Sequence, residues 1–345
     1  MTPAADLSEC VERLLRAFRT YDRAVDVVSA FEMVYTSSQS ELPATVQHFE
    51  RFPRISVPGH NPVRPDFTVV FKDGAGMAGE IARIARPDES VEDLCSQIGR
   101  YDELRQLPGQ VGAVDVKHMD VLLLVPLDVG PAAVRRIIVE RYLNPDHAYS
   151  PGAPPCIVQF GYDEGRYILQ RLPDERNGMP RDGDRPDGLA QWFTRNGDFR
   201  AAPSRFADIK AARAFMNDPV DALYLATHLW AKTFATDVGA TGAARPVRVA
   251  VRASDLAAEL REQHGGVRSG DVERALELLT SAKLAERTAD GWVVAWEELR
   301  SSGERDLPHI IATRACRPPM KGALARLEAA ERGAAAAPEP PPSLF

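Results

Sequence analysis

The sequence predicts an α/β fold in which helices flank a mixed sheet, followed by a smaller and mainly helical region. Over residues 1–172, apolar runs of strand length are interleaved with amphipathic segments of helix length, which is typical of helices packed on a sheet. Beyond a stretch rich in glycine and proline, helical patterns dominate and only short strand-like runs remain. The chain has 345 residues and is 44% hydrophobic, which suffices for two globular domains.

Helical patterns open the chain. Apolar residues at helical spacing predict two amphipathic helices, over residues 4–18 and 23–36. A third helix is predicted through LPATVQHFERF, residues 42–52, and a short strand is predicted at RISV, residues 54–57. These elements lead directly into the first predicted hairpin.

A hairpin is predicted from PDFTVVF, residues 65–71, the KDGAG turn and the strand that returns from it. Alternation places these residues on one face: Asp66, Thr68 and Val70 on the first strand, and Ala78, Glu80 and Ala82 on the second. With the turn centred near Gly74, Asp66 is expected opposite Ala82, and Thr68 opposite Glu80. Asp66 and Glu80 are therefore predicted to be diagonal neighbours, about 7–8 Å apart.

The remaining elements of the first domain alternate between helix and strand. A helix is predicted from about Ser90, where SVED forms a capping box, and a second over residues 131–143, with proline in its first turn. Between them, MDVLLLVP at residues 119–126 predicts a buried strand, because its apolar run is continuous as in parallel sheets. A second hairpin over residues 156–172 closes the domain.

The composition changes after residue 172. Residues 173–216, which include PDERNGMPRDGDRPDG, are predicted to be a linker or a long surface loop. Residues 217–300 form the second predicted domain, and residues 301–345 a basic segment followed by a disordered proline-rich tail. The elements expected in the second domain are a helix at 219–234, a strand at 246–251, helices at 253–263 and 269–284, and a hairpin at 285–296.

Composition narrows the classes of function. The formal net charge of −7 argues against a uniformly basic surface, so any contact with nucleic acid must come from local patches. The cysteines lack close pairs and histidines at zinc spacing, which argues against a disulfide framework and favours a reducing cytoplasm: Cys10, Cys95, Cys156 and Cys316. Residues 1–15 lack a signal-peptide pattern, and the most apolar run, residues 121–127, is too short to span a bilayer. We therefore expect a cytoplasmic protein without a membrane partner.

Three motifs, in order along the chain, resemble those of the PD-(D/E)xK nuclease superfamily. They are Pro65-Asp66, Glu80-Ile81-Ala82, and Gln97 to Tyr101, the last being similar to the QxxxY element that many members carry on the helix after the second core strand. The resemblance implies a restriction-endonuclease-like mixed sheet and a Mg²⁺ site, with Mn²⁺ as the alternative metal. The implied ligands are Asp66, Glu80 and the carbonyl of Ile81, and Gln97 and Tyr101 belong to the same implied catalytic site.

One position departs from the family pattern. Ala82 stands where the family has a lysine that orients the attacking water or stabilises the transition state, and alanine can do neither. The residues considered as substitutes are Lys72, Arg83, Arg86 and Lys117, and Glu32 is considered as an additional acid. In a regular strand Arg83 faces the opposite side, and Lys72 lies roughly 20 Å along the strand from Asp66. Asp66 and Glu80 each have a structural role as the alternative to a catalytic one. In that case Asp66 only caps the entry to a strand, and Glu80 is only a strand residue that faces solvent.

The order helix, strand, helix, helix, hairpin over residues 217–300 resembles the winged-helix module. This resemblance implies DNA binding through the helix at 269–284, whose charges are nevertheless unfavourable for approaching phosphate: Asp271, Glu273 and Glu277 against Arg274 and Lys283. The candidate nucleic-acid contacts are Arg268, Arg274, Arg287, Arg314, Arg317 and Lys321. The alternative is a module that forms a homodimer or contacts a partner protein.

These observations lead to one hypothesis with two alternatives. The leading hypothesis is a DNA-acting protein of prokaryotic DNA processing or defence, which hydrolyses phosphodiesters if a cation replaces the missing lysine. The alternatives are a non-catalytic binding protein that keeps the nuclease fold, and a DNA-binding regulator that acts through the winged helix.

Overall fold

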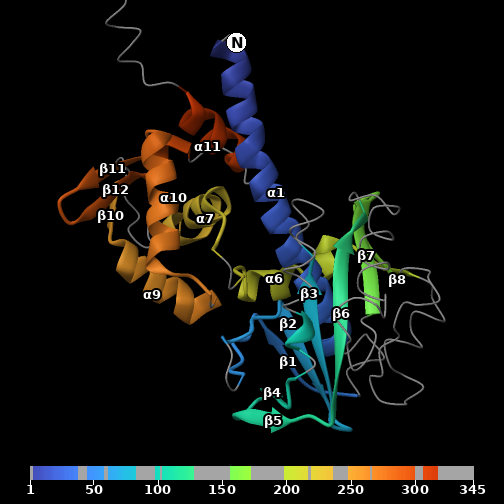
Figure 1. Ribbon diagram of the computed structural model, residues 1–345. Coiled ribbons are helices and arrows are strands. Elements are labelled where there is room, and N and C mark those ends of the chain that lie inside the picture. Colours follow the sequence, from blue (N-terminus) through green and yellow to red (C-terminus); the bar gives the residue numbers. More distant parts are fainter. Residues whose placement is uncertain are drawn as a thin grey trace, which may run out of the picture.

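The computed structural model contains a seven-stranded sheet and a three-stranded sheet, joined through helices (Figure 1). The structure describes residues 3–37, 45–57, 61–82, 98–101, 103–127, 156–171, 198–216, 219–235, 248–264, 266–299 and 306–317. Most of the helix predicted from Ser90, and all of the one predicted over residues 131–143, lie outside these residues. Among the helices that the structure describes, none has the length and apolar character that a membrane span requires.

The chain begins with one long helix, α1 (Pro3–Thr36), where the sequence predicts two shorter ones. The prediction of a break near residues 19–22 is wrong, because neither proline nor glycine interrupts residues 4–36. The second half of α1 packs on the large sheet, and residues 24–31 are buried there. The first half extends past the sheet to the C-terminal helices (Figure 1).

The large sheet is mixed and has the strand order β1-β2-β3-β6-β7-β8-β9. Its strands are β1 (Val46–Arg51), β2 (Phe67–Phe71), β3 (Ala75–Ile81), β6 (His118–Pro126), β7 (Cys156–Asp163), β8 (Arg166–Arg171) and β9 (Asp198–Ala201). Strand β6 is parallel to both of its neighbours, β3 and β7, as its continuous apolar run predicts. The other neighbouring strands pair antiparallel, and β4 (Gln106–Pro108) and β5 (Ala113–Asp115) form a separate hairpin.

Strand β1 occupies most of the segment predicted as a third helix. Phe49 packs on Tyr35 of α1 and on Phe67 of β2, with ring centroids 6.0 Å and 5.2 Å away. Pairing with β2 and this aromatic contact override the helical spacing of the segment, so the prediction of a helix is wrong. The strand predicted at residues 54–57 is reduced to a single bridge between Ile55 and Val63.

The first hairpin is present, but its register is shifted from the predicted one. Thr68 pairs with Ala78 instead of Glu80. The cause is the turn, which closes with a hydrogen bond from the Gly74 N–H to the Phe71 carbonyl and holds Gly74 at a φ of 88°. A shift by two residues leaves each side chain on its predicted face, because side chains alternate with a period of two. The shared face of Asp66, Thr68 and Val70 with Ala78, Glu80 and Ala82 is therefore preserved.

Two apolar cores cover the two faces of the sheet. The first core lies between the sheet and α1 and continues without a break into the C-terminal region. The second core lies on the opposite face and contains Val70, Ala78 and Ala82 together with Ile98 and Tyr101. The apolar residues predicted to share a face with Asp66 and Glu80 thus belong to the second core.

Gly79 of β3 is required by the first core. A Cβ at this position would lie 2.1 Å from the ring of Phe67, which is stacked between Phe31 and Phe49. We expect Gly79→Ala to lower the free energy of unfolding by about 1–3 kcal/mol, because the buried ring cannot move aside. The control is Gly270→Ala in an open helical position, expected to be neutral or stabilising. Equal midpoints of urea unfolding for the two variants would contradict this expectation.

The C-terminal module, residues 219–299, contains the elements that the sequence predicts and in that order. They are α7 (Ala222–His228) with a π-helical turn η5 (Leu229–Thr233), β10 (Arg248–Val251), α9 (Ala253–His264), α10 (Ser269–Ser281), β11 (Ala285–Thr288) and β12 (Gly291–Ala295). The strands form an antiparallel sheet in the order β10-β12-β11. After η6 (Trp296–Leu299), helix α11 (Leu307–Cys316) returns to pack on α1, α7 and α10.

His228 at the end of α7 makes the stability of the module depend on pH. Its ring packs on Phe215 and His264, and burial, with the nearby charges of His264 and Lys232, lowers the pKa of His228 from 6.5 to about 4. Because the pKa of His228 is lower in the folded state, protonation of its ring favours unfolding. The free energy of unfolding is therefore highest above the unfolded-state pKa, and it decreases as pH falls from about 6.5 to 4. The loss is on the order of 3 kcal/mol at most. In urea unfolding, His228→Gln should reduce the pH dependence of the free energy of unfolding, whereas His309→Gln, at an exposed position, should leave it unchanged. The same pH dependence in both variants would contradict this expectation.

Part of the predicted linker is structured. Residues 198–201 form β9, the edge strand of the large sheet, followed by η4 (Pro203–Arg205) and α6 (Ala207–Ala212), which packs on α1. These elements are too short to give a periodic signal, and they adjoin a stretch rich in glycine and proline.

Helix α6 is held to α1 by a partly buried polar network. Lys210 forms ion pairs with Asp22 and Asp26, with N···O distances of 2.5 Å and 2.7 Å. The Tyr167 hydroxyl donates a hydrogen bond of 2.6 Å to Asp26. Burial raises the pKa of Asp26, and Lys210 opposes this effect. The network therefore joins α6, α1 and β8.

A disulfide links the two ends of the described chain. Cys10 of α1 and Cys316 of α11 are bonded, with Cα atoms 5.9 Å apart across 306 residues of sequence. The expectation that no disulfide forms is therefore wrong, because cysteine spacing gives no sign that these helices meet. Cys156 is free and buried, and Cys95 lies outside the described residues. Since disulfides are uncommon in a reducing cytoplasm, this bond does not support the predicted location.

Candidate functional site

Asp66 directly precedes β2 and lies beside the end of β3. It is buried, and its Oδ2 accepts a hydrogen bond of 2.7 Å from the main-chain N–H of Ile81. Its own N–H donates to the carbonyl of Gly79, and its carbonyl accepts from the N–H of Phe52. The Asp66 carboxylate is therefore fixed beside the residue that follows Glu80. We call this end of the sheet the carboxylate end.

Glu80 is oriented by Tyr101. The Tyr101 hydroxyl donates a hydrogen bond of 2.7 Å to Oε2 of Glu80, and the Tyr101 side chain is fully buried in the second core. Alternation in β3 places Glu80 on the face of the sheet that carries the second core. Residues 98–101 pack on this face and supply Tyr101. The structure thus brings together Asp66, Glu80, Ile81 and Tyr101.

Other residues of the sequence-based site are not placed by the structure. Gln97, Arg83 and Arg86 lie outside the described residues. Within the described residues, no group of three or more histidine, cysteine, aspartate and glutamate side chains is arranged to hold a metal ion. The described candidate ligands are therefore two carboxylates, Asp66 and Glu80, with the main-chain carbonyl of Ile81.

The lysine position of the family is buried. Ala82 is 1% exposed and belongs to the second core with Ile98 and Tyr101. Lys117 lies at the turn end of the hairpin, where its Nζ donates a hydrogen bond of 2.6 Å to the carbonyl of Asp73. Lys72 belongs to the same turn, so both lysines are at the end of the hairpin opposite to the carboxylate end.

Thr68 and Gln159 are buried polar residues on the Asp66 face that sequence reasoning does not assign to the site. They are 1% and 2% exposed, and Oγ1 of Thr68 and Nε2 of Gln159 have no hydrogen-bond partner in the described part of the chain. The strand register places Gln159 level with Ala82, about 10 Å away across two strand spacings. A glutamine inside the apolar run CIVQF is the available sequence signal, since buried polar atoms normally have partners.

Glu32 is not an additional acid of this site. Its carboxylate pairs with Nε of Arg51, whose side chain is 1% exposed. Arg51 belongs to β1 and pairs in register with Phe67, a residue of the first core. Glu32 therefore stabilises a buried arginine, a role that the sequence does not indicate because β1 is predicted as a helix.

Two of the candidate arginines of the C-terminal module, Arg274 and Arg287, form ion pairs within the module. Arg274 pairs with buried Asp271 at 2.5 Å. Arg287 pairs with Glu277 at 2.6 Å and lies over the ring of Trp292, 5.2 Å from its centroid. The backbone N–H of Arg268 donates to Asp271 in the capping box of α10. The exposed face of α10 consequently carries two glutamates and one paired arginine: Glu273, Arg274 and Glu277.

The basic residues that follow the module are partly helical. Arg314 lies in the last turn of α11, and Arg317 is its C-cap residue. Helix α11 buries Leu307 and Ile311 and is bonded to α1, so this part of the predicted basic segment is a packed helix. Lys321 lies outside the described residues.

Comparisons with known proteins give no match. No protein-family model, curated protein or solved structure matches the chain.

Proposed function

We propose that this chain is a DNA-acting protein of the PD-(D/E)xK nuclease type, which hydrolyses phosphodiesters with Mg²⁺ or Mn²⁺ held by Asp66 and Glu80. The observation that carries the proposal is the pairing of the two acids with separate orienting groups at one end of the sheet. The Ile81 N–H holds Asp66, and the Tyr101 hydroxyl holds Glu80. Carboxylates held in this way can receive a metal ion without reorganising.

The arrangement of strands supports the restriction-endonuclease-like fold proposed for this region. Helix α1 precedes the antiparallel strands β1, β2 and β3, and β6 then adds to β3 in parallel. The acids come from β2 and β3, which are the strands that the motif resemblance requires. Topology and motif together support the nuclease type, since a fold alone does not determine function.

The donor set fits Mg²⁺. This ion binds hard oxygen ligands and commonly uses one or two carboxylates together with water and substrate phosphate. Asp66 and Glu80 would supply the carboxylates, and the carbonyl of Ile81 would supply a third oxygen. When bound, such an ion neutralises the charge that develops on the phosphate and lowers the pKa of bound water. Tyr101 would keep Glu80 in position while substrate binds.

A second candidate is a non-catalytic binding protein with the same fold. The observation that favours it is the burial of Ala82 among Ile98 and Tyr101, which leaves the lysine position apolar. Neither of the described lysines near this hairpin, Lys72 and Lys117, replaces the missing cation, because both lie at its turn end. In this candidate the protein binds DNA and the metal but breaks no bond.

The C-terminal module supports a winged-helix fold by its element order, but its charges favour a role other than reading DNA through α10. Glu273 and Glu277 on the exposed face would repel phosphate, and Arg274 is already paired. We therefore propose that α10 contacts a partner protein or a second copy of the chain.

A cleavage assay distinguishes the two candidates. The full chain is incubated with supercoiled plasmid or circular single-stranded DNA in Mg²⁺, in Mn²⁺ or in EDTA. The leading proposal predicts nicked or linear products in either metal and none in EDTA. Intact DNA in both metals, with DNA binding retained, would overturn hydrolysis and support the non-catalytic candidate.

A further inference from the structure

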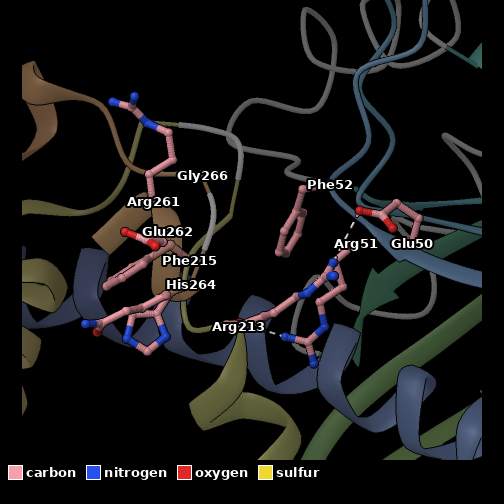
Figure 2. A pocket seen from close by; sticks show the side chains of 10 residues that line it. Glu50, Arg51, Phe52, Arg213, Phe215, Arg261, Glu262, His264 and Gly266 are labelled. Atoms are coloured by element: carbon pink, nitrogen blue, oxygen red, sulfur yellow. Dashed lines mark hydrogen bonds and ion pairs between the residues drawn. The ribbon is translucent and has the colours of Figure 1, made fainter. Parts of the chain in front are cut away.

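A second polar site lies between the large sheet and the C-terminal module. It is a cleft of about 420 Å³, open to solvent (Figure 2). Its lining comes from the end of β1 with the residue after it, the segment after α6, and the last turn of α9 with the loop that follows, and it includes Glu50, Arg51, Phe52 and Arg213. Neither Asp66 nor Glu80 lines it, so it is distinct from the candidate metal site.

Arg51 lines this cleft, and one nitrogen of its guanidinium has no hydrogen-bond partner in the described part of the chain. Its Nε pairs with Glu32, and its Nη1 donates a hydrogen bond of 2.7 Å to the carbonyl of Arg213. Its Nη2 is buried and has no hydrogen-bond partner within the described residues. Burial lowers the pKa of Arg51, although Glu32 acts in the opposite direction. An unpaired buried donor is costly, so an acceptor that reached Nη2 would be bound favourably.

Arg213 places a second guanidinium near the first, and Figure 2 shows the two side chains on the same side of the cleft. Its Nη1 lies 3.2 Å from Oε1 of Glu50, and these side chains are 47% and 28% exposed. Exposed ion pairs of this kind contribute about 1 kcal/mol or less, so Arg213 can exchange Glu50 for a ligand. An anion between Arg51 and Arg213 would also relieve their mutual repulsion.

Phe52 connects the cleft to the carboxylate end. Its backbone adopts a φ of 49°, which bulky side chains rarely do and which is often found where a site requires it. Its N–H donates to the carbonyl of Asp66, so the cleft and Asp66 lie on neighbouring strands, about 5 Å apart by backbone. The Arg51 side chain lies on the face of the sheet that carries the first core, whereas Asp66 and Glu80 lie on the opposite face. A polyanionic chain bound in the cleft would therefore reach these acids by passing around β1, the edge strand of the sheet.

We propose that this cleft binds a phosphate group through Arg51 and Arg213, and that the phosphate belongs to the DNA strand on which the Asp66–Glu80 site acts. The first part stands on the cleft alone, whereas the second rests on the proposed function. Single-stranded DNA is the favoured source, because a flexible strand can turn around the edge strand β1, and a free nucleotide is the alternative for the same phosphate chemistry.

Binding is tested on the full chain in EDTA, which removes divalent metal from the measurement. The probe is a fluorescently labelled single-stranded oligonucleotide, followed by anisotropy over a range of salt concentrations. Arg213→Gln is expected to weaken binding about tenfold and to reduce the salt slope by about one. Arg205→Gln, which removes an exposed charge outside the cleft, is the matched control and is expected to bind as wild type does.

Glu50→Gln provides a test in the opposite direction, because it removes the acid that competes for Arg213. It is expected to tighten binding at least about twofold. Equal affinities of wild type, Arg213→Gln and Glu50→Gln would overturn the assignment of the cleft. If inorganic phosphate or dAMP displaced the oligonucleotide at comparable concentrations, the proposal that the phosphate belongs to a DNA strand would be overturned, and the cleft would be a small-molecule site. If the chain bound the oligonucleotide through Arg213 but bound no Mn²⁺, the phosphate site in the cleft would be supported and the proposed metal-dependent hydrolysis would be overturned.

Discussion

Replacing Asp66 by asparagine is expected to reduce metal-dependent cleavage of DNA by about 1000-fold. The substitution keeps the size of the side chain and an oxygen that can accept the Ile81 N–H, but it removes the negative charge that binds the metal ion. Loss of Lewis-acid stabilisation corresponds to several kcal/mol of activation free energy, which sets the size of the effect. Glu80→Gln should act similarly, because the amide oxygen can still accept from Tyr101.

The matched control is Asp163→Asn, which removes one negative charge at an exposed position on the β7–β8 hairpin. Cleavage rates of wild type, control and site variants are compared at equal protein and metal concentrations. A site variant that cuts as fast as the control would remove Asp66 and Glu80 from the mechanism. Tyr101→Phe separates positioning from chemistry, since it should raise the metal concentration needed for half-maximal cleavage more than it lowers the maximal rate.

Breaking the Cys10–Cys316 disulfide is expected to lower the free energy of unfolding by about 5 kcal/mol, at the upper end for such bonds. The bond closes a loop of 306 residues, and loop-closure entropy grows with the logarithm of that length. It also joins α1 to α11, which share the first core with the C-terminal module. The reduced chain should therefore unfold at a lower urea concentration.

The measurement compares wild type, wild type in dithiothreitol, and the Cys10→Ser/Cys316→Ser double variant. Dithiothreitol should lower the midpoint for wild type to that of the double variant and should not change the double variant further. A wild-type midpoint that does not respond to reduction, together with free thiols at both cysteines, would show that the bond does not form in solution.

The sequence predicts the face on which Asp66 and Glu80 lie better than it predicts the elements around them. Asp66 and Glu80 are predictable because alternation within short strands fixes the face of a side chain even when the register is shifted by two residues. The shift itself follows from the Gly74 turn, whose centre a sequence pattern does not determine. Tyr101 is predictable as a motif residue, but its hydrogen bond to Glu80 depends on how residues 98–101 pack on the sheet.

Long-range features are the ones that sequence reasoning misses. The Cys10–Cys316 bond requires that α1 continue through residues 19–22 and that α11 return to it, and neither follows from local periodicity. The cleft around Arg51 and Arg213 combines three distant segments, one of which is predicted as a helix. Gln159 gives a local signal as a polar residue in an apolar strand, but its alignment with Ala82 requires the strand order.

The most direct test of the central claim, that Asp66 and Glu80 form a divalent metal site, is calorimetric titration of Mn²⁺ into the full chain without DNA. We predict one ion bound per chain for wild type and for Asp163→Asn, and no measurable binding for the Asp66→Asn/Glu80→Gln double variant. Binding of Mn²⁺ by the double variant with the affinity of wild type, or no binding by wild type, would contradict the account.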